Sequence, residues 1–520
     1  MKIERTKNAS QNIFFGVLLR LQQTVLPFLM RTVMLHYMGV QYLGLNSLFS
    51  SILHILNLAE LGVGSAMVFS MYKPIAEDDE VTICALMRLY RRYYRMIGLL
   101  IGVIGLVLTP VIPHLISGDI PGELNIYVLY WLNLGATVLT YWLFAYKNCL
   151  LQAHQRTDKI SAVTMITGIV QCAVQLLVLI FIRNYYVYLI VALAVQALNN
   201  VCTAVVAGRM YPQYQPQGKL SREKTKGINR RIRDLFTSKL GNVITNSCDS
   251  AVISAFLGLS VLAIYQNYFF ILTAVIGVID ILLQSIIAGL GNSFITETKE
   301  KNYQDLKKFT FLFMWLTGVC TCCFLGLYQP FMEIWTGKDL MLGNTAVICF
   351  AVYFWAYTAA RFLNVYKDAA GLWHEDRFRP LISAVINLGL NLLWVKPLGI
   401  YGVLLSTVIS IVVVSLPWLL RNIFTVLFPR KLLRDYVGYL MGIVAAAGMA
   451  GVLVWLLCLP IQGNPWVALV LRGLISVIAS NLLFWLLLHR SRQFGPAVEM
   501  LDKLTKNKLK LAKRLFRKEQ

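Results

Sequence analysis

The chain has 520 residues, of which 58% are hydrophobic and 14% are charged, and its formal net charge is +23. This composition is too apolar for a soluble enzyme and predicts an all-α integral membrane protein. Because the basic residues fall in short segments beside apolar stretches, the charge indicates contact with anionic lipid headgroups and argues against nucleic acid as a partner.

Fourteen apolar segments follow one another along the chain, and most reach the roughly 20 residues that a membrane-spanning helix requires. They cover residues 12–36, 42–70, 95–116, 125–147, 160–182, 187–209, 235–257, 263–293, 308–330, 341–366, 378–395, 400–424, 436–458 and 466–489.

Lys and Arg are distributed unequally when these segments are threaded through a membrane in alternation. One face holds 42 of the 48 basic residues when the eight in the segment halves nearest that face are counted with it. The other six are Arg183, Lys338 and Lys396 on the opposite face, and Arg20, Arg31 and Arg472 deeper within segments. Short loops rich in Lys and Arg remain in the cytoplasm. We therefore expect a multi-pass membrane protein with both termini in the cytoplasm.

A polar stretch after the sixth segment divides the chain. The predicted parts are an N-terminal six-helix lobe (1–211), a cytoplasmic linker (212–234), a C-terminal six-helix lobe (235–430), transmembrane helices 13 and 14 (431–490) and a basic amphipathic cytoplasmic tail (491–520). Leucines alternate with basic residues from Leu501 onward, which favours a helix lying on the inner leaflet. A solvated, frayed tail is the alternative.

The two lobes show a weak internal repeat. A shift of 219 residues lays 38–44 on 257–263, each predicted as a tight turn between long helices, and lays Met87-Arg88 on Leu306-Lys307. Both lobes begin on the cytoplasmic side. The repeat is therefore predicted to be parallel, with its axis along the membrane normal.

Two arginines and several polar residues interrupt the first two segments. Arg20 and Arg31 are eleven residues apart, which places both on one helix face. A charge facing lipid costs several kcal/mol, so we expect these guanidinium groups to face a water-filled cavity or a carboxylate. The alternative is that they extend toward opposite membrane interfaces. In the second segment, Asn46, Asn57 and Glu60 share a face.

Matching polarity recurs in the second half of the chain. Asn242 and Asp249 lie in the seventh segment, and Asp280 and Gln284 lie in the eighth. The tenth segment carries Arg361 and, near its predicted cytoplasmic end, Lys367 and Asp368, for which ordinary interfacial charge is the alternative interpretation.

These residues predict a transporter with two kinds of site. Guanidinium and ammonium groups bind phosphate or pyrophosphate, which assigns a substrate cavity to Arg20, Arg31, Arg361 and Lys367, with Asn46, Asn57, Asn242 and Gln284 as its polar lining. The carboxylates of Glu60, Asp249, Asp280 and Asp368 are candidates for coupling to Na⁺ or H⁺, and permanent structural pairing is their alternative. We predict no catalytic residue, no metal centre and no cofactor other than such a coupling ion, because acid and base groups do not converge.

Several short motifs point to a family. They read YLGL at 42–45, LAELGVGSA at 58–66, YKP at 72–74, YKDAAGLW at 366–373, DRFRPL at 376–381 and LGIYGV at 398–403. With fourteen spans and basic residues in the helices, they make the chain resemble the polysaccharide-transporter branch of the multidrug/oligosaccharidyl-lipid/polysaccharide flippase superfamily.

The resemblance implies a specific activity and a place in the bacterial cytoplasmic (cell) membrane. Such a protein moves undecaprenyl-pyrophosphate-linked oligosaccharide repeat units from the inner to the outer leaflet by alternating access, for capsule or exopolysaccharide assembly, with an ion gradient as the energy source. The implied partners are the lipid-linked oligosaccharide, membrane lipids, and a polysaccharide polymerase and glycosyltransferases. In the seventh segment the string NSCDSA at 246–251 departs from the family's commonest pattern, which leaves the role of Asp249 open.

Three other functions remain open at this stage. A lipid II flippase would share the spans and the mechanism. A multidrug or cation antiporter of the same superfamily usually has twelve spans and an acidic cavity. A membrane-embedded glycosyltransferase or polymerase would belong to a different class and would need an acid/base site, for which Asp119 and Glu123 form the only acidic pair in an outward loop.

Overall fold

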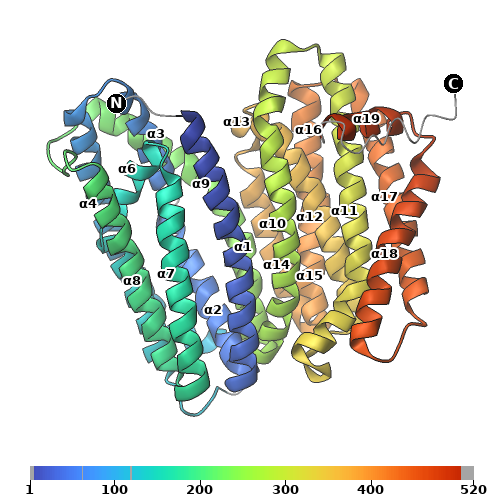
Figure 1. Cartoon of the computed structure of the whole chain (residues 1–520), viewed down its shortest axis with the longest axis horizontal. Helices are drawn as coiled ribbons and strands as arrows, with labels where there is room; N and C mark the ends of the chain where they lie inside the picture. The colour runs from blue at the N-terminus through green and yellow to red at the C-terminus, as the bar shows by residue number, and fades with distance from the viewer. Residues whose placement is uncertain (1–4, 61, 118–119, 505–520) are drawn as a thin grey trace. The chain divides into compact units, whose positions relative to one another are not determined.

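Every regular element in the described part of the chain is a helix, which confirms the all-α prediction (Figure 1). The computed structural model describes residues 5–60, 62–117 and 120–504. The chain divides into two compact units, Met1–Ile264 and Tyr265–Gln520. The tail predicted at 491–520 is described only through the helix α19 (Phe494–Leu504), and its basic residues after 504 lie outside the described residues.

The first unit consists of long helices joined by short helical turns. Its elements are α1 (Arg5–Tyr37), α2 (Val40–Leu56), η1 (Asn57–Glu60), α3 (Val63–Ala76), α4 (Glu80–Leu108), η2 (Thr109–Leu115), α5 (Ile126–Trp142), η3 (Ala145–Lys147), α6 (Asn148–Ala153), α7 (Thr157–Leu177), the π-helical turn η4 (Val178–Ile182), α8 (Tyr185–Met210) and α9 (Arg222–Leu257).

The second unit has the same construction. Its elements are α10 (Leu259–Thr296), α11 (Lys299–Thr336), η5 (Lys338–Leu340), α12 (Asn344–Ala369), α13 (Trp373–Asp376), α14 (Arg379–Leu398), α15 (Ile400–Ile409), the π-helical turn η6 (Ser410–Ser415), α16 (Leu416–Val426), α17 (Lys431–Cys458), α18 (Pro465–Leu488) and α19. The division falls after the first residues of α10 because α9 packs against α2 and α3. The lobe boundaries expected from the sequence stay a prediction.

Polar residues mark where many helices begin. An Asn, Asp, Ser or Thr side chain accepts a hydrogen bond from a backbone N–H of the first turn, which satisfies a donor that has no partner within the helix. Such capping residues are Asp79, Asn125, Asn184, Ser221, Thr298 and Asn464.

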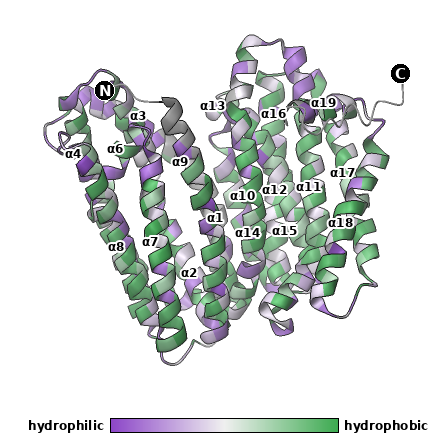
Figure 2. Cartoon of the chain, in the orientation of Figure 1, coloured by the Kyte–Doolittle hydropathy of each residue, from purple (hydrophilic) through white to green (hydrophobic). Residues whose placement is uncertain are grey.

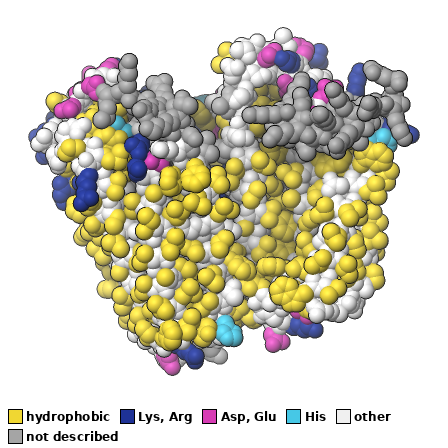
Figure 3. Space-filling model, in the orientation of Figure 1, with side chains coloured by type: hydrophobic (Ala, Val, Ile, Leu, Met, Phe, Trp, Pro, Cys, Tyr) yellow, Lys and Arg dark blue, Asp and Glu magenta, His cyan; other side chains and the backbone are white. Residues whose placement is uncertain are grey.

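Hydrophobic residues follow the middle of the long helices in both units (Figure 2). On the visible surface, apolar side chains cover the middle of each unit and charged side chains gather toward its ends (Figure 3). Among the described residues, ten helices are long and apolar enough to cross a membrane, or eleven if the bent pair α5 and η3–α6 forms one span. Each of the fourteen predicted segments overlaps a helix, and the count of fourteen crossings stays a prediction.

Two predicted spans are broken where continuous helices were expected. Segment 42–70 is divided into α2, η1 and α3, with Gly62 at a positive φ of 88° before α3 begins. Segment 125–147 bends by 47° after α5. Hydropathy does not register these breaks, because the residues on both sides are apolar. The two breaks place polar side chains between the apolar helices.

The two C-terminal helices pack against α11. Cys322 of α11 is fully buried among Ala446, Ala450 and Val454 of α17 and Phe484 of α18. At Gly318 of α11, an added Cβ would overlap the Phe484 ring. Small residues thus allow α11, α17 and α18 to approach closely, as expected for helices that associate within lipid.

The repeated turn noted in the sequence adopts one backbone conformation in both places. Gly39, before α2, has φ 105° and ψ 173°, and Gly258, before α10, has φ 93° and ψ 169°. Residues with a side chain rarely adopt this conformation, which explains why the 219-residue shift aligns two glycines.

Gly44 lies where α2 meets the start of α10. A Cβ built on Gly44 would overlap the backbone carbonyl oxygen of Leu259 and lie 2.8 Å from its carbonyl carbon. Since the obstructing atoms belong to the backbone, a side-chain rotation cannot relieve the contact. This explains the glycine in the motif at 42–45.

We predict that Gly44→Ala lowers the stability of the protein by about 1–3 kcal/mol, because the two segments must move apart. The control is Gly448→Ala in α17, where nothing lies within 4 Å of the new Cβ. Thermal unfolding of both variants in detergent measures the difference, and equal melting temperatures would contradict the close contact.

Candidate functional site

Arg31 lies in a cavity within the first unit. The cavity has a volume of about 300 Å³ and is formed by α1, α2, α7 and α8. Its polar lining includes Asn46, Gln171 and Gln175, and Arg31 Nη2 donates a hydrogen bond to Ser47 Oγ at 3.3 Å. We call it the Arg31 cavity. Two residues predicted for the substrate cavity, Arg31 and Asn46, therefore meet in one place.

Arg20 does not line the Arg31 cavity, and its side chain is exposed in the first unit. Eleven residues of helix separate it from Arg31, which corresponds to roughly 16 Å along the axis. The two arginines share α1, but only Arg31 is enclosed with the polar residues of α2 and α7.

Glu60 lies in a second pocket of the first unit, with a volume of about 430 Å³. Its Oε1 accepts a hydrogen bond from Tyr94 Oη, and Tyr94 in turn accepts one from Tyr90 Oη at 2.6 Å. Tyr141 Oη lies 2.8 Å from Glu60 Oε2 and 3.0 Å from Asn57 Oδ1. We call this the Glu60 pocket. It joins Asn57 and Glu60, as the shared helix face predicted, to tyrosines that the sequence did not single out.

Arg361 and Asp280 pair directly in the second unit. Arg361 Nη2 and Nε lie 2.9 and 3.0 Å from Asp280 Oδ1, and about a third of each side chain is exposed. The sequence assigned one residue to anion binding and the other to ion coupling. Their contact makes each the charge partner of the other, so any ligand of one acts on both.

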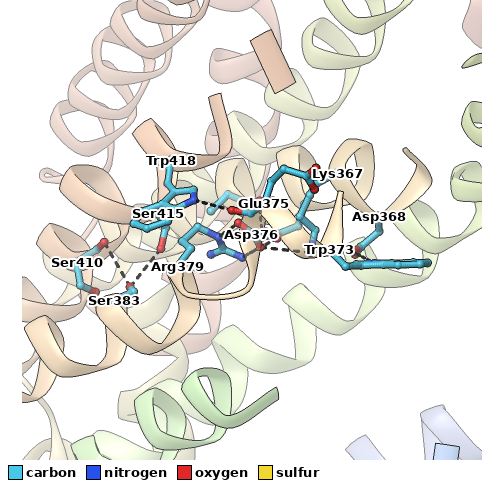
Figure 4. A network of polar contacts seen from close by, with 12 residues as sticks. Lys367, Asp368, Trp373, Glu375, Asp376, Arg379, Ser383, Ser410, Ser415 and Trp418 are labelled. Atoms are coloured by element: carbon cyan, nitrogen blue, oxygen red, sulfur yellow. Dashed lines mark hydrogen bonds and ion pairs between the residues drawn. The ribbon is translucent and has the colours of Figure 1, made fainter. Parts of the chain in front are cut away.

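Lys367 is enclosed between two carboxylates. Its Nζ lies 2.8 Å from Asp368 Oδ1 and 3.4 Å from Asp376 Oδ2 (Figure 4). Trp373 Nε1 also donates to Asp368 Oδ1 at 3.2 Å. The two neighbouring carboxylates oppose binding of an anion at Lys367 in this conformation.

Asp376 is the buried centre of this network. Arg379 binds it bidentately, with Nε–Oδ1 2.7 Å and Nη2–Oδ2 2.9 Å, and also donates to Asn364 Oδ1 at 2.9 Å. Both charged side chains are less than a tenth exposed. Figure 4 shows how the network joins the end of α12 and α13 to the start of α14. The motif at 376–381 contained both residues, but nothing in its spacing marked them as a pair.

The first unit contains the same arrangement of charges. Arg156 binds Asp158 bidentately, with Nε–Oδ1 2.9 Å and Nη2–Oδ2 3.1 Å, and Lys159 Nζ lies 3.8 Å from Asp158 Oδ2. Asp158 is 1% exposed. The surrounding sequences align at a shift of 220 residues, since Tyr146-Lys147 and His154 match Tyr366-Lys367 and His374. At this shift Arg156 matches Asp376, Asp158 matches Phe378 and Lys159 matches Arg379. Each unit therefore has a buried Asp held by one Arg and one Lys near the corresponding junction, but at different positions.

The remaining predicted site residues are dispersed. Asp249 of α9 is buried in the first unit, Gln284 of α10 is exposed in the second, and the side chain of Asn242 lies outside the described residues. The structure thus gathers the candidates into the Arg31 cavity, the Glu60 pocket, the Arg361–Asp280 pair and the Lys367 network.

The segment after α8 folds back on the first unit outside the membrane-spanning helices. The His154 ring stacks on Tyr211 and Tyr214, with centroid distances of 4.2 and 5.7 Å, and Arg88 Nη1 donates to the Gly218 carbonyl at 3.0 Å. Burial lowers the pKa of His154, so its neutral form is favoured near pH 7.

Comparisons with known proteins agree on the fold. Residues 44–289 match the family model described as polysaccharide biosynthesis protein. The fold is similar to that of the lipid II flippase MurJ in an inward closed conformation, with TM-score 0.68 and 13% identity over 91% of this chain and 98% of that chain. No curated protein matches the chain.

Multidrug transporters have similar folds. An inward-facing MATE family transporter of the MOP superfamily gives TM-score 0.60 and 16% identity over 80% of this chain and 99% of that one. A MATE transporter of Vibrio cholerae gives TM-score 0.56 and 13% identity over 83% and 98%. These neighbours are transporters and flippases, not enzymes, and they confirm the predicted fold class.

We predict that Arg379→Ala destabilises the protein by about 3–5 kcal/mol, because it leaves the buried Asp376 carboxylate without its bidentate partner. The matched control is Arg377→Ala, since Arg377 is exposed and stacks on Phe378 with a Cζ–centroid distance of 4.7 Å. Thermal unfolding in detergent compares them. If both variants melt at the same temperature, the Asp376–Arg379 pair contributes nothing to stability.

Proposed function

We propose that the chain is a member of the polysaccharide-transporter branch of the multidrug/oligosaccharidyl-lipid/polysaccharide flippase superfamily. The family match and the shared fold support this proposal. The chain moves an undecaprenyl-pyrophosphate-linked oligosaccharide from the inner to the outer leaflet by alternating access. It serves capsule or exopolysaccharide assembly, alongside a polymerase and glycosyltransferases.

The observation that carries this proposal is the Arg31 cavity. An ionisable side chain among helices that span the membrane commonly marks a substrate or ion pathway, and Arg31 is such a side chain beside a cavity. Arginine donates bidentately to phosphoryl oxygens, and the amides of Asn46 and Gln171 line the same space. With about 300 Å³, the cavity reaches the lower end of the range for organic ligand pockets.

The proposed coupling to Na⁺ or H⁺ centres on Asp280. Its partner Arg361 lies on a different helix, α12, so a cation or proton bound at Asp280 weakens one contact between α10 and α12. An anionic substrate at Arg361 weakens the same contact from the other side. Competition for one ion pair is a physical means of linking ion and substrate binding.

Lipid II flipping is the second candidate. The similarity to MurJ, with TM-score 0.68 over 91% of this chain, favours it over drug export, for which the similar folds have TM-scores of 0.60 or less. Both lipids carry a pyrophosphate, so the Arg31 cavity suits either one.

The function is tested in proteoliposomes by the leaflet accessibility of a lipid-pyrophosphate-linked oligosaccharide to a membrane-impermeant sugar-modifying reagent, with and without an ion gradient. Lipid II is the comparison substrate. Protein-dependent movement of the oligosaccharide lipid supports the proposal. If only lipid II crosses the membrane, the protein serves peptidoglycan synthesis. If a cationic dye is exported and neither lipid crosses, the protein is a drug exporter.

We expect Arg31→Ala to reduce lipid movement at least tenfold while protein abundance and membrane insertion stay normal, because it removes a phosphate-binding charge from the cavity. Arg20→Ala is expected to have a smaller effect, since Arg20 is exposed and does not line the Arg31 cavity. The control is Arg183→Ala, since Arg183 lies over the Tyr37 ring, 5.4 Å from its centroid, and outside the Arg31 cavity. Normal transport by Arg31→Ala would exclude the Arg31 cavity as the substrate site.

For coupling, we predict that Asp280→Asn weakens the dependence of transport on a Na⁺ or H⁺ gradient, because an amide neither takes up a proton nor carries the charge that attracts Na⁺. Transport rates are measured with and without each gradient. The double variant Asp280→Asn with Arg361→Gln controls for an unpaired arginine. Unchanged gradient dependence in both variants would make the pair purely structural.

A further inference from the structure

The Glu60 pocket has a composition unlike that of the Arg31 cavity. Eleven of its sixteen lining residues are polar, and most are Asn, Gln, Thr or Tyr. Glu60 supplies the negative charge, and no Lys or Arg lines the pocket within the described residues. A pyrophosphate therefore does not fit here, and a ligand rich in hydrogen-bond donors does.

The pocket forms at a break in a membrane helix. α5 ends at Trp142, Phe144 has a positive φ of 58°, and the chain continues at an angle of 47°. Asn200 Nδ2 donates to the Thr140 carbonyl at 3.0 Å, which satisfies an acceptor near the end of α5. Irregular backbone at membrane depth is tolerated where it is buried in protein or lines a cavity. The break at Phe144 opens the space between α5 and α8.

Several side chains present oxygen acceptors to this space. Asn133 and Asn200 both use their amide nitrogen on helix carbonyls, so the Oδ1 atom remains as the acceptor of each. The Glu60 carboxylate is held by Tyr94 and Tyr141, and each of its oxygens retains acceptor capacity. Amide and carboxylate oxygens around tyrosine rings are suited to bind sugar hydroxyl groups.

The volume of the Glu60 pocket favours a sugar over a bare cation as its ligand. A volume of about 430 Å³ falls within the range of pockets for organic ligands. A bare cation such as Na⁺ would fill only a small part of this volume. The pocket also adjoins the Arg31 cavity, because Gln171 lines both.

We propose that the Glu60 pocket is a carbohydrate subsite, in which a sugar ring donates hydroxyl hydrogens to Glu60 and to the amide oxygens of Asn133 and Asn200. The inference deepens the proposed function and rests on it for the transported ligand. With the pyrophosphate at Arg31, the neighbouring sugar occupies the Glu60 pocket, and Gln171 lies between the two groups. Glu60 is then a substrate ligand, in place of the ion-coupling role that its charge alone had suggested.

The first test measures binding without transport. The purified full-length protein in detergent is melted with glucose, galactose, N-acetylglucosamine or glucuronate, and separately with NaCl against choline chloride at equal ionic strength. A bound ligand raises the melting temperature. At least one sugar is expected to stabilise the wild type, and its apparent affinity is expected to fall about tenfold in Glu60→Gln and in Asn133→Ala.

The matched control is Asn199→Ala, which removes an amide on the same helix as Asn200 but outside the pocket. It should keep the sugar response of the wild type. Stabilisation by Na⁺ that is lost in Glu60→Gln, without any sugar response, would overturn the subsite in favour of a cation site. Absence of stabilisation by every sugar would also overturn it.

The second test separates this inference from the proposed function. In proteoliposomes, Asn133→Ala and Gln196→Ala are expected to slow movement of the oligosaccharide lipid about tenfold and to leave undecaprenyl phosphate without sugar unaffected. Equal slowing of both lipids would overturn the subsite while the flippase function stands. If the wild type moves neither lipid but still responds to a sugar in the melting test, the proposed function fails and the subsite stands.

Discussion

The cost of placing charge among membrane-spanning helices determines how the functional parts of this protein are built. An ionised side chain in such a helix needs a partner of opposite charge, hydrogen bonds or water. Each solution occurs here. Arg361 pairs with Asp280, Glu60 is held by two tyrosine hydroxyls, and Arg31 faces a polar cavity. The paired groups hold helices together, and Arg31 places a positive charge beside a cavity.

Two breaks in predicted membrane helices also require partners for buried polar groups. Where a helix ends inside the protein, its last carbonyl groups need other donors. Asn200 supplies one for α5, and the turn at 57–60 places Glu60 beside tyrosines of α4 and α5. The breaks therefore coincide with the Glu60 pocket. A continuous helix would have left neither the space nor the acceptors.

Similar Asp–Arg–Lys networks occur in both units. Asp158 and Asp376 lie near corresponding junctions, though not at matching positions, and each is held bidentately by arginine with a lysine beside it. A buried bidentate pair fixes the angle between the elements it joins far more strongly than an exposed ion pair does. Each network thereby stiffens the junction within its own unit.

The sequence by itself determined the helices, the apolar segments, the family motifs and the identity of Arg31 and Glu60 as unusual charges. All of these depend on composition and on spacing within one helix, which are local properties. Only the tertiary structure decided that Arg361 pairs with Asp280, 81 residues away, that Arg20 lies apart from the Arg31 cavity, and that Asp376 is held by Arg379 and Lys367 together. The helix breaks after Leu56 and at Phe144 were also decided by the tertiary structure, because the apolar segments continue on both sides of them. Which charge meets which partner depends on the packing of helices distant in the chain, and no local pattern encodes it.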